Sequence, residues 1–208
     1  MVQAANARDE TAAEAEQLFQ AGQELYREGS VASLRAAIEK FEAVIPLYQA
    51  ANNRFGEALA RTAAGRAHDS LGFNSEALSH YEPALEIWQF LAQQASGEDL
   101  STIQTWQATT LNNIGGVYSA LGEKQQALAY YEQALPLLEA VGDRGGEATT
   151  LNNIGWVYDA LGEMQQALAY FEQALPILEA VGDRSGEAVT LNNAARVKRA
   201  LRILCKPN

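Results

Sequence analysis

The chain has 208 residues, of which 48% are hydrophobic, enough for one large or two small domains with a buried core. Its formal net charge of −11 repels nucleic-acid phosphates, so we expect no nucleic-acid partner. The sequence has no membrane-spanning apolar run, the start MVQAANARDE lacks a secretory apolar core, and the single cysteine, Cys205, excludes an intrachain disulfide. We therefore expect a soluble, cytoplasmic protein without membrane contact.

The first half of the chain contains a polar start and two helical repeats. Residues 1–10 are polar and are expected to be flexible. The segments at about 14–56 and 57–106 are rich in the strong helix formers Ala, Leu, Glu and Gln, and glycines divide each into two helices. The recurring residues are Gly22, Ala37 and Phe41 in the first segment and Gly65, Ala77 and Tyr81 in the second. This composition predicts an all-α protein.

The connection between the second and third repeats is longer than the others. Ala84 and Gln107 are 23 residues apart, whereas the equivalent Ala134 and Glu147 are 13 apart. The additional residues lie around 96–104, after an expected helix stop at Ser96–Gly97. They either loosen the two halves of the chain or lengthen the first helix of the third repeat. The cost of a structureless insertion inside a stacked array favours the longer helix.

Residues 107–146 and 147–186 are two copies of one structural unit. They align without a gap and differ at only seven of 40 positions. Each copy is predicted to form two helices, which in the second copy run from about Gly146 to Leu161 and from about Met164 to Val181. Gly162 and Gly182 follow these helices and can adopt the left-handed conformation that ends a helix. Asp183 can cap the helix that comes next.

One set of small and large residues recurs at fixed spacing in both copies. In the second copy it comprises Leu151, Ile154, Gly155, Tyr158, Ala167, Phe171 and Ala174, which form one apolar face on each helix. This spacing resembles the tetratricopeptide repeat family, in the long form seen in kinesin light chains, LGN-type adaptors and bacterial arrays. The resemblance implies a right-handed superhelical α-solenoid of antiparallel helix pairs over residues 11–208. Its four repeats would occupy about 14–56, 57–106, 107–146 and 147–186, followed by a C-terminal capping helix at 187–204.

Prolines occur at an unusual place in this pattern. Pro46, Pro136 and Pro176 occupy one equivalent position inside the second helix of a repeat. An interior proline costs about 3 kcal/mol in a regular helix, so each of these helices either bends or ends there. The apolar pattern continues beyond Pro176 through Ile177 and Leu178, which favours a bend.

The segment after the fourth repeat begins like another first helix and then departs from the pattern. Five basic residues accompany only one acidic residue, Glu187; they are Arg196, Lys198, Arg199, Arg202 and Lys206. Repeat arrays need a polar outer cap, and a solvated cap is the interpretation we favour over a basic docking surface.

No pattern in the chain indicates catalysis. The sequence has no phosphate-binding loop, dinucleotide glycine fingerprint or HExxH string, so we expect no enzyme activity and no cofactor. His68 and His80 occupy the positions of Tyr158 and Tyr170 in the fourth repeat. A metal site needs at least a third ligand, so we interpret both histidines as packing residues and expect no bound metal. Cys205 is interpreted as a free thiol.

The best candidate for a functional surface is the stripe of the first helices that lies opposite their packing face. The family resemblance implies that first helices line a concave groove in which asparagines pair with a peptide backbone. Asparagine carries both a donor and an acceptor, and the alternative is that the same amides join neighbouring helices. Trp156 either stands on this stripe or packs into the space that Gly116 leaves. The candidate residues are Asn112, Asn113, Asn152, Asn153, Trp156, Asp159, Asn192, Asn193 and Arg196.

The function that this resemblance implies is that of an adaptor which holds a protein or peptide in the groove. Two alternatives remain open at this point. The first alternative is a regulatory or targeting module of an enzyme system, for example a caspase-like protease partner. The second is a structural array that self-associates weakly through its near-identical units.

Overall fold

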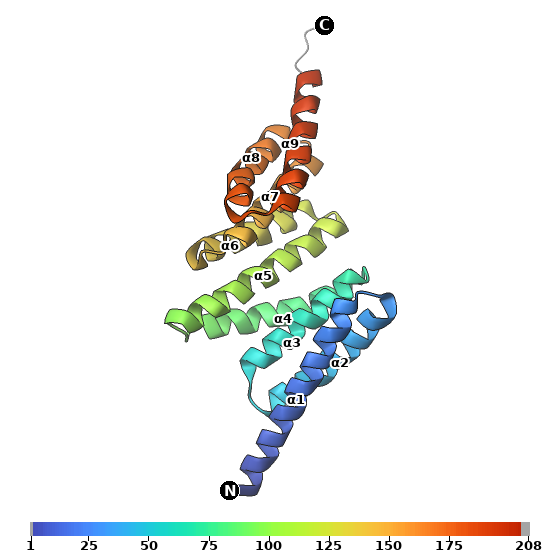
Figure 1. Cartoon of the computed structure of the whole chain (residues 1–208), viewed down its shortest axis with the longest axis vertical. Coiled ribbons are helices and arrows are strands. Elements are labelled where there is room, and N and C mark those ends of the chain that lie inside the picture. The colour runs from blue at the N-terminus through green and yellow to red at the C-terminus, as the bar shows by residue number, and fades with distance from the viewer. Residues whose placement is uncertain (1, 205–208) are drawn as a thin grey trace. The chain divides into compact units, whose positions relative to one another are not determined.

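The computed structural model describes the backbone of residues 2–204 and the side chains of residues 12–202. Within this range the chain forms nine helices and no strand (Figure 1). They are α1 (Val2–Glu28), α2 (Val31–Ala50), α3 (Arg54–Ser70), α4 (Asn74–Ala92), α5 (Gly97–Leu121), α6 (Lys124–Val141), α7 (Arg144–Ala160), α8 (Met164–Val181) and α9 (Arg184–Leu204). The all-α class and the repeated helix pairs are confirmed. Cys205 and Lys206 lie outside the described residues.

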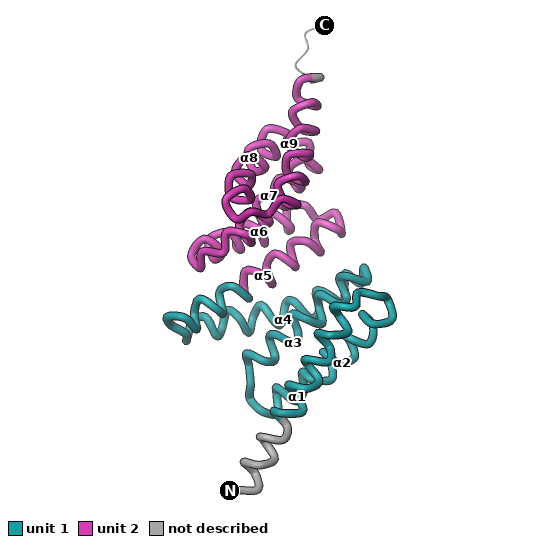
Figure 2. The backbone as a smooth tube through the Cα atoms, viewed as in Figure 1, with its two compact units in different colours: residues 1–106 teal, residues 107–208 magenta. Residues whose placement is uncertain are grey.

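The helices are divided between two compact units, residues 1–106 and 107–208 (Figure 2). In the first unit α2 packs against both α1 and α3, and α3 packs against α4. In the second unit α7 packs against α6 and α8, and α8 packs against α9. First helices of neighbouring repeats also touch, α1 with α3 and α7 with α9. The right-handed superhelix over the whole chain stays a prediction.

The helix ends follow from glycine and aspartate at the expected places. Gly162 and Gly182 adopt φ angles of 80° and 74°, in the left-handed region that ends a helix. Asp183 then caps α9, because its Oδ1 accepts a hydrogen bond from the backbone N–H of Gly186 at 2.9 Å. Asp143 makes the equivalent bond at the start of α7. These local signals set the 40-residue period.

The additional residues between the second and third repeats belong to a helix. α5 begins at Gly97 and continues to Leu121, so it is the longest of the helices after α1. The expected lengthening of the first helix of the third repeat is therefore observed. α1 likewise begins at Val2, within the segment 1–10 whose flexibility stays a prediction.

The prolines do not end their helices. α2, α4, α6 and α8 continue through Pro46, Pro83, Pro136 and Pro176, respectively. In α8 the residues beyond the proline, Ile177 and Leu178, are buried. Their burial stabilises the last turns of the helix, which offsets the lost backbone hydrogen bond.

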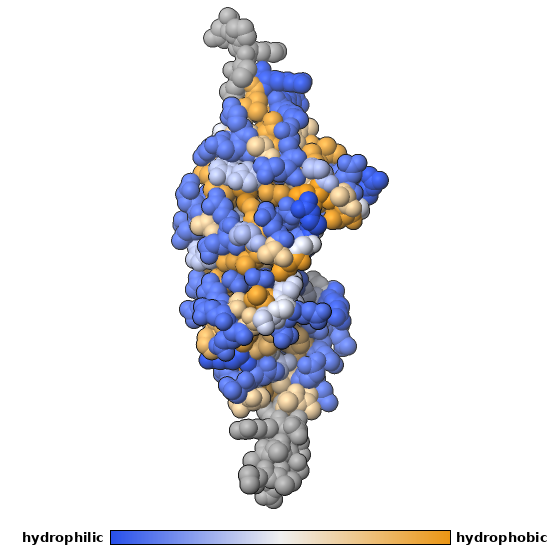
Figure 3. Space-filling view, turned by 90° about the vertical axis from the view of Figure 1, so that its left-hand side faces the viewer, coloured by the Kyte–Doolittle hydropathy of each residue, from blue (hydrophilic) through white to orange (hydrophobic). Residues whose placement is uncertain are grey.

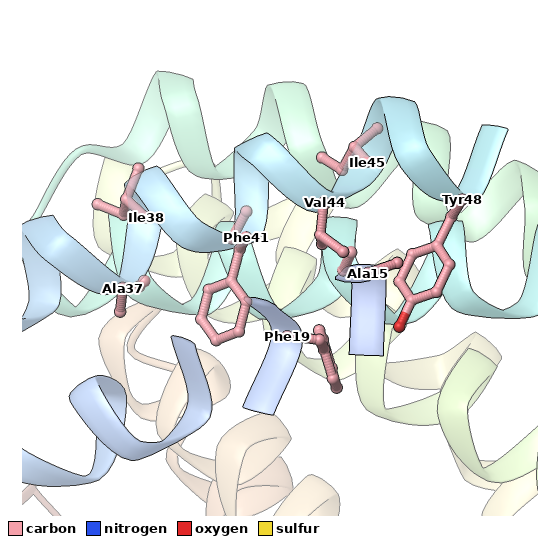
Figure 4. Close-up of a cluster of buried hydrophobic side chains, with 11 residues drawn as sticks. Ala15, Phe19, Ala37, Ile38, Phe41, Val44, Ile45 and Tyr48 are labelled. Carbon is pink, nitrogen blue, oxygen red and sulfur yellow. The ribbon is translucent and has the colours of Figure 1, made fainter. Parts of the chain in front are cut away.

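The core of each unit is built around packed aromatic rings. In the first unit Phe19 of α1 lies between Phe41 and Tyr48 of α2, with ring centroids 5.6 Å and 6.5 Å away (Figure 4). In the second unit the ring of Phe171 lies beside Gly155, where an added Cβ would come within 2.6 Å of the ring. The glycine is thus required for the close approach of α7 and α8.

The capping helix packs through one apolar face. Ala194 and Val197 of α9 are buried against Ala167 and Phe171 of α8. Lys198 stands where the third and fourth repeats have tyrosine, and its Nζ lies 2.8 Å from a carboxylate oxygen of Glu172. Both side chains of that ion pair are half exposed, so it contributes little to stability.

Ala167 offers a direct test of this packing. It is fully buried among Phe171, Ala194 and Val197. We expect Ala167→Leu to lower the free energy of unfolding by about 1–3 kcal/mol, because the added atoms overpack the contact of α8 with its neighbours. Urea denaturation followed by circular dichroism measures the change, and an unchanged midpoint would contradict the assigned packing face.

None of the helices in the described part of the chain is both long and apolar enough to cross a membrane.

Candidate peptide-binding face

The first asparagine of each pair is used inside the array. Asn112 of α5 donates from Nδ2 to Oγ1 of Thr150 at 2.7 Å, and Oγ1 of Thr150 lies 3.0 Å from Oδ1 of Asn112. Asn152 of α7 accepts from Oγ1 of Thr190 at 3.2 Å. Both threonines are buried on the next first helix. Asn112 and Asn152 therefore join neighbouring first helices, which is one of the two roles that the sequence left open for these amides.

The second asparagine of each pair is in a different situation. The Nδ2 atoms of Asn113 and Asn193 are buried and have no hydrogen-bond partner among the described residues. Asn153 is half buried, while Asn192 on α9 is exposed. Buried amide donors without a partner are few in folded proteins. Asn113 and Asn193 are thus the members of the predicted ladder whose amide nitrogen atoms have no hydrogen-bond partner among the described residues.

Trp156 extends from α7 with 48% of its side chain exposed. Cζ of Arg196 lies 5.4 Å from the centre of the indole ring, in cation–π geometry. Nη2 of the same arginine lies 2.5 Å from Oδ2 of Asp159, which is largely buried. The sequence predicted that these three residues share a stripe, and the structure brings them into contact.

This arrangement reduces the net charge of the stripe beside Trp156. Arg196 is engaged by Asp159, so the two charges compensate each other beside the tryptophan. Near Gly116 of α5 there is open space, since a Cβ added there would meet only Oη of Tyr131 at 3.8 Å. The contact found for the indole ring is with α9 and leaves half of its surface open to a ligand.

In the first unit the same stripe holds a pocket of about 310 Å³. Phe19 and Thr62 stand at the position of the first asparagine, and Ala63 stands at the position of the second. All three line the pocket, together with Gln23, Tyr26, Arg27, Phe41, Leu59, Arg66 and Trp106. The pocket therefore has apolar and aromatic walls in place of paired amides.

Two arginines stand at the rim of this pocket. Cζ of Arg66 lies 5.0 Å above the ring of Tyr26, and Arg66 occupies the position that Trp156 has in the fourth repeat. Sequence reasoning missed the pocket, although the replacement of asparagine by Phe19 and Ala63 was a visible signal. What was not visible is that Trp106, in the first half of the lengthened α5, contributes to the same wall.

On the face that Figure 3 shows, apolar side chains are interspersed among hydrophilic ones. The large hydrophobic side chains exposed among the described residues include Trp156, Phe90, Val189 and Leu191. Of these four, Trp156 belongs to the predicted stripe of the first helices, and Val189 lies one helical turn before Asn192 on α9. Phe90 lies on a second helix, and Leu191 takes the position of the buried Leu151.

Residues 106–180 match a family model described as tetratricopeptide repeat. No curated protein matches the chain significantly. Many solved structures do, and two of them are the apo form of RapI and aspartyl phosphate phosphatase F from Bacillus subtilis. RapI is 17% identical with a TM-score of 0.74, over 89% of this chain and 48% of that one. The phosphatase is 15% identical with a TM-score of 0.76, over 98% and 50%.

A third similar structure contains the nearly identical TPR-like repeats of a putative kinesin light chain from Podosopora anserina. It is 16% identical with a TM-score of 0.68, and the match covers 89% of this chain and 87% of that one. The present chain thus spans about half the length of RapI and of the phosphatase and most of the kinesin light chain repeats. At these identities the likeness concerns the fold.

Proposed function

We propose that this chain, a repeat protein of the tetratricopeptide type, is a protein-interaction scaffold whose first helices bind an extended segment of a partner protein. The observation that carries the proposal is the half-exposed indole of Trp156 on the stripe of the first helices. Arg196 and Asp159 hold it in place, so little conformational freedom is lost when a ligand packs against it. Tryptophan is also among the residues most often found at interface hot spots.

The neighbouring amides supply the polar part of the proposed site. Asn113 and Asn193 have buried amide donors without partners, and Asn153 is half buried. A small rotation of these side chains would let them pair with the backbone N–H and C=O groups of an extended peptide. Asn112 and Asn152 support the site indirectly, because they hold neighbouring first helices together. The compensated charges at Trp156 favour an uncharged peptide segment there.

The stripe in the first unit supports the same function with different chemistry. Its pocket of about 310 Å³ is at the lower end of the range for ligand sites. The aromatic walls suit a large apolar side chain of a partner, and Arg27 and Arg66 at the rim suit a carboxylate next to it.

We expect Trp156→Ala to weaken peptide binding about 30-fold, which corresponds to the roughly 2 kcal/mol of a hot-spot residue. A library of random peptides displayed on phage would be selected on the unmodified chain. Affinities of the selected peptides would then be measured by fluorescence polarisation. Asn113→Ala combined with Asn153→Ala is expected to weaken the same peptides, because their backbone groups lose hydrogen-bond partners.

Phe90→Ala is the matched control. Phe90 is 50% exposed, close to the 48% of Trp156, but lies on the second helix α4. The proposal predicts unchanged affinity for Phe90→Ala and an unchanged circular dichroism spectrum for all variants. Peptides that bind every variant equally well would refute a site on the first helices.

Fewer observations support the two alternative functions, self-association and a role in an enzyme system. Val189 and Leu191 of α9 are 51% and 49% exposed, which is a reason to keep weak self-association as a second candidate function. Its signature is a size in solution that increases with concentration. The role of an enzyme-system module, such as a caspase-like protease partner, has no feature of its own among the described residues.

A further inference from the structure

Two histidines and a glutamate from three consecutive helices meet in the first unit. Nε2 of His68 on α3 and Nε2 of His80 on α4 each lie 3.2 Å from Oε1 of Glu42 on α2. The three atoms all lie within 4.8 Å of one another. The two histidine side chains are largely buried, at 11% and 15% exposure, while that of Glu42 is 47% exposed. The cluster is therefore a nearly closed cup that opens to solvent at the carboxylate.

The tyrosine pairs at the equivalent positions of the third and fourth repeats show which side chains are sufficient for packing there. Tyr158 and Tyr170 occupy the equivalent positions and stack with centroids 5.4 Å apart and planes 11° apart. His68 and His80 stack in nearly the same way, at 5.3 Å and 17°. Tyr118 and Tyr130 make the third such pair. Two tyrosines thus satisfy the packing, and the imidazoles bring a chemistry that the other stacks lack.

A glutamate at the position of Glu42 also occurs in later repeats, so the carboxylate by itself does not indicate a metal site. Glu132 occupies the position of Glu42 beside the tyrosine stack, where burial first, and then Tyr170 and Glu132, raise the pKa of Tyr158. At the next equivalent place Glu172 pairs with Lys198. Among the described residues, the glutamate at this position meets two imidazole nitrogen atoms in the first unit only. Each Nε2 offers a lone pair when its imidazole is neutral and carries its proton on Nδ1.

We propose that Glu42, His68 and His80 bind a divalent transition-metal ion, with Zn²⁺ the ion that fits best. Two imidazoles, one carboxylate and a water molecule form a common tetrahedral zinc site. With zinc–ligand bonds of about 2.0–2.1 Å, neighbouring ligand atoms in a tetrahedron are about 3.3 Å apart. Both nitrogen–oxygen distances, at 3.2 Å, already match that edge. Water reaches the fourth position from the exposed side of Glu42.

Two features of the cluster limit its affinity. The imidazole rings must tilt out of their stack so that both Nε2 lone pairs point at one ion. In addition, Nδ1 of each histidine is buried and finds no hydrogen-bond partner among residues 12–202. A metal-bound imidazole normally donates this N–H to an acceptor. We therefore expect binding weaker than in structural zinc sites. The ion would link α2, α3 and α4, so it would stabilise the first unit by mass action.

The experiment compares Zn²⁺ binding to the full-length chain and to variants by isothermal titration calorimetry. His68→Tyr combined with His80→Tyr installs the tyrosine pair that the array already uses, so this variant is expected to fold. The unmodified chain should bind one Zn²⁺ more than this variant. Its melting midpoint should also rise with added Zn²⁺, whereas that of the double variant should not.

Glu42→Gln keeps both rings and should weaken Zn²⁺ binding at least tenfold, because a neutral amide replaces the charged ligand. Co²⁺ bound to the unmodified chain should give the strong visible absorption of tetrahedral coordination, and the double variant should lose it. Cys205 and the other carboxylates are present in all of these proteins, so their contribution cancels. Equal Zn²⁺ stoichiometry and affinity in the unmodified chain and both variants would overturn the proposal. Binding of Mg²⁺ as tight as that of Zn²⁺ would also overturn it.

Discussion

Phe171→Ala is expected to lower the free energy of unfolding by about 3–5 kcal/mol, the range found when a fully buried phenylalanine is truncated. The side chain of Phe171 has no exposed surface. Its ring fills the space between Gly155 on α7 and the buried Ala194 and Val197 on α9. Gly155 and Ala194 have few atoms that could fill the vacated volume, and the backbones of α7 and α9 that carry them are held by their other contacts with α8. The cavity would remain, and its cost adds to the lost burial of the ring.

Trp156→Ala provides the comparison within the same repeat. The indole is larger than the phenyl ring but 48% exposed, so we expect its truncation to change stability by less than about 1 kcal/mol. Chemical denaturation of both variants, followed by circular dichroism at 222 nm, measures the two changes. Since repeats are stabilised through their neighbours, the loss for Phe171→Ala should extend to the transition of the whole second unit. Equal losses for the two variants would mean that the assignment of core and surface is wrong.

Gly115→Ala is expected to destabilise the chain, whereas Gly116→Ala, one residue further along α5, is expected to be tolerated. A Cβ at Gly115 would lie 2.7 Å and 2.8 Å from ring carbons of Tyr131, which is 3% exposed and cannot move away. A Cβ at Gly116 would meet only Oη of Tyr131 at 3.8 Å. Both changes gain up to about 1 kcal/mol of helix propensity. The difference between them therefore isolates the overpacking, about 1–3 kcal/mol.

The midpoints of thermal and urea denaturation measure this difference. Gly116→Ala should unfold at or above the midpoint of the unmodified chain, and Gly115→Ala below it. Replacing Tyr131 by Leu in both backgrounds removes the ring that causes the clash, so the two alanine variants should then differ less. Identical midpoints for Gly115→Ala and Gly116→Ala would contradict the close contact of α5 with α6.

Several features of the fold could be predicted because they depend on residues near one another in the chain. The left-handed Gly162 and Gly182 and the cap at Asp183 were all visible in the sequence. So were the buried faces that carry Ala167 and Phe171. Local dihedral preferences and a 3.6-residue period act within one or two helical turns. A near-perfect repeat then copies each such signal 40 residues further along.

The candidate site could be predicted only as a set of positions on a stripe. Asn112 and Asn113 are adjacent in the same LNN string, and no local rule distinguishes them. In the structure Asn112 is bonded to Thr150, 38 residues away, while the amide nitrogen of Asn113 has no partner in the part of the chain that the structure describes. The rotation of each helix about its own axis decides which amide reaches the next helix, and that rotation is set by packing.

What the sequence by itself determined is thus the helical repeat, its period and the stripe on which Trp156 and the asparagines stand. Only the tertiary structure decided what these side chains touch: Arg196 above Trp156, Phe19 and Trp106 in one pocket wall, and Glu42 against both histidines. Glu42 precedes His68 by 26 residues and His80 by 38, and no helical period links these positions. The physical reason is that secondary structure depends on short-range preferences. The chemistry of a site depends instead on distances between atoms of different helices, which exist only once the helices have packed.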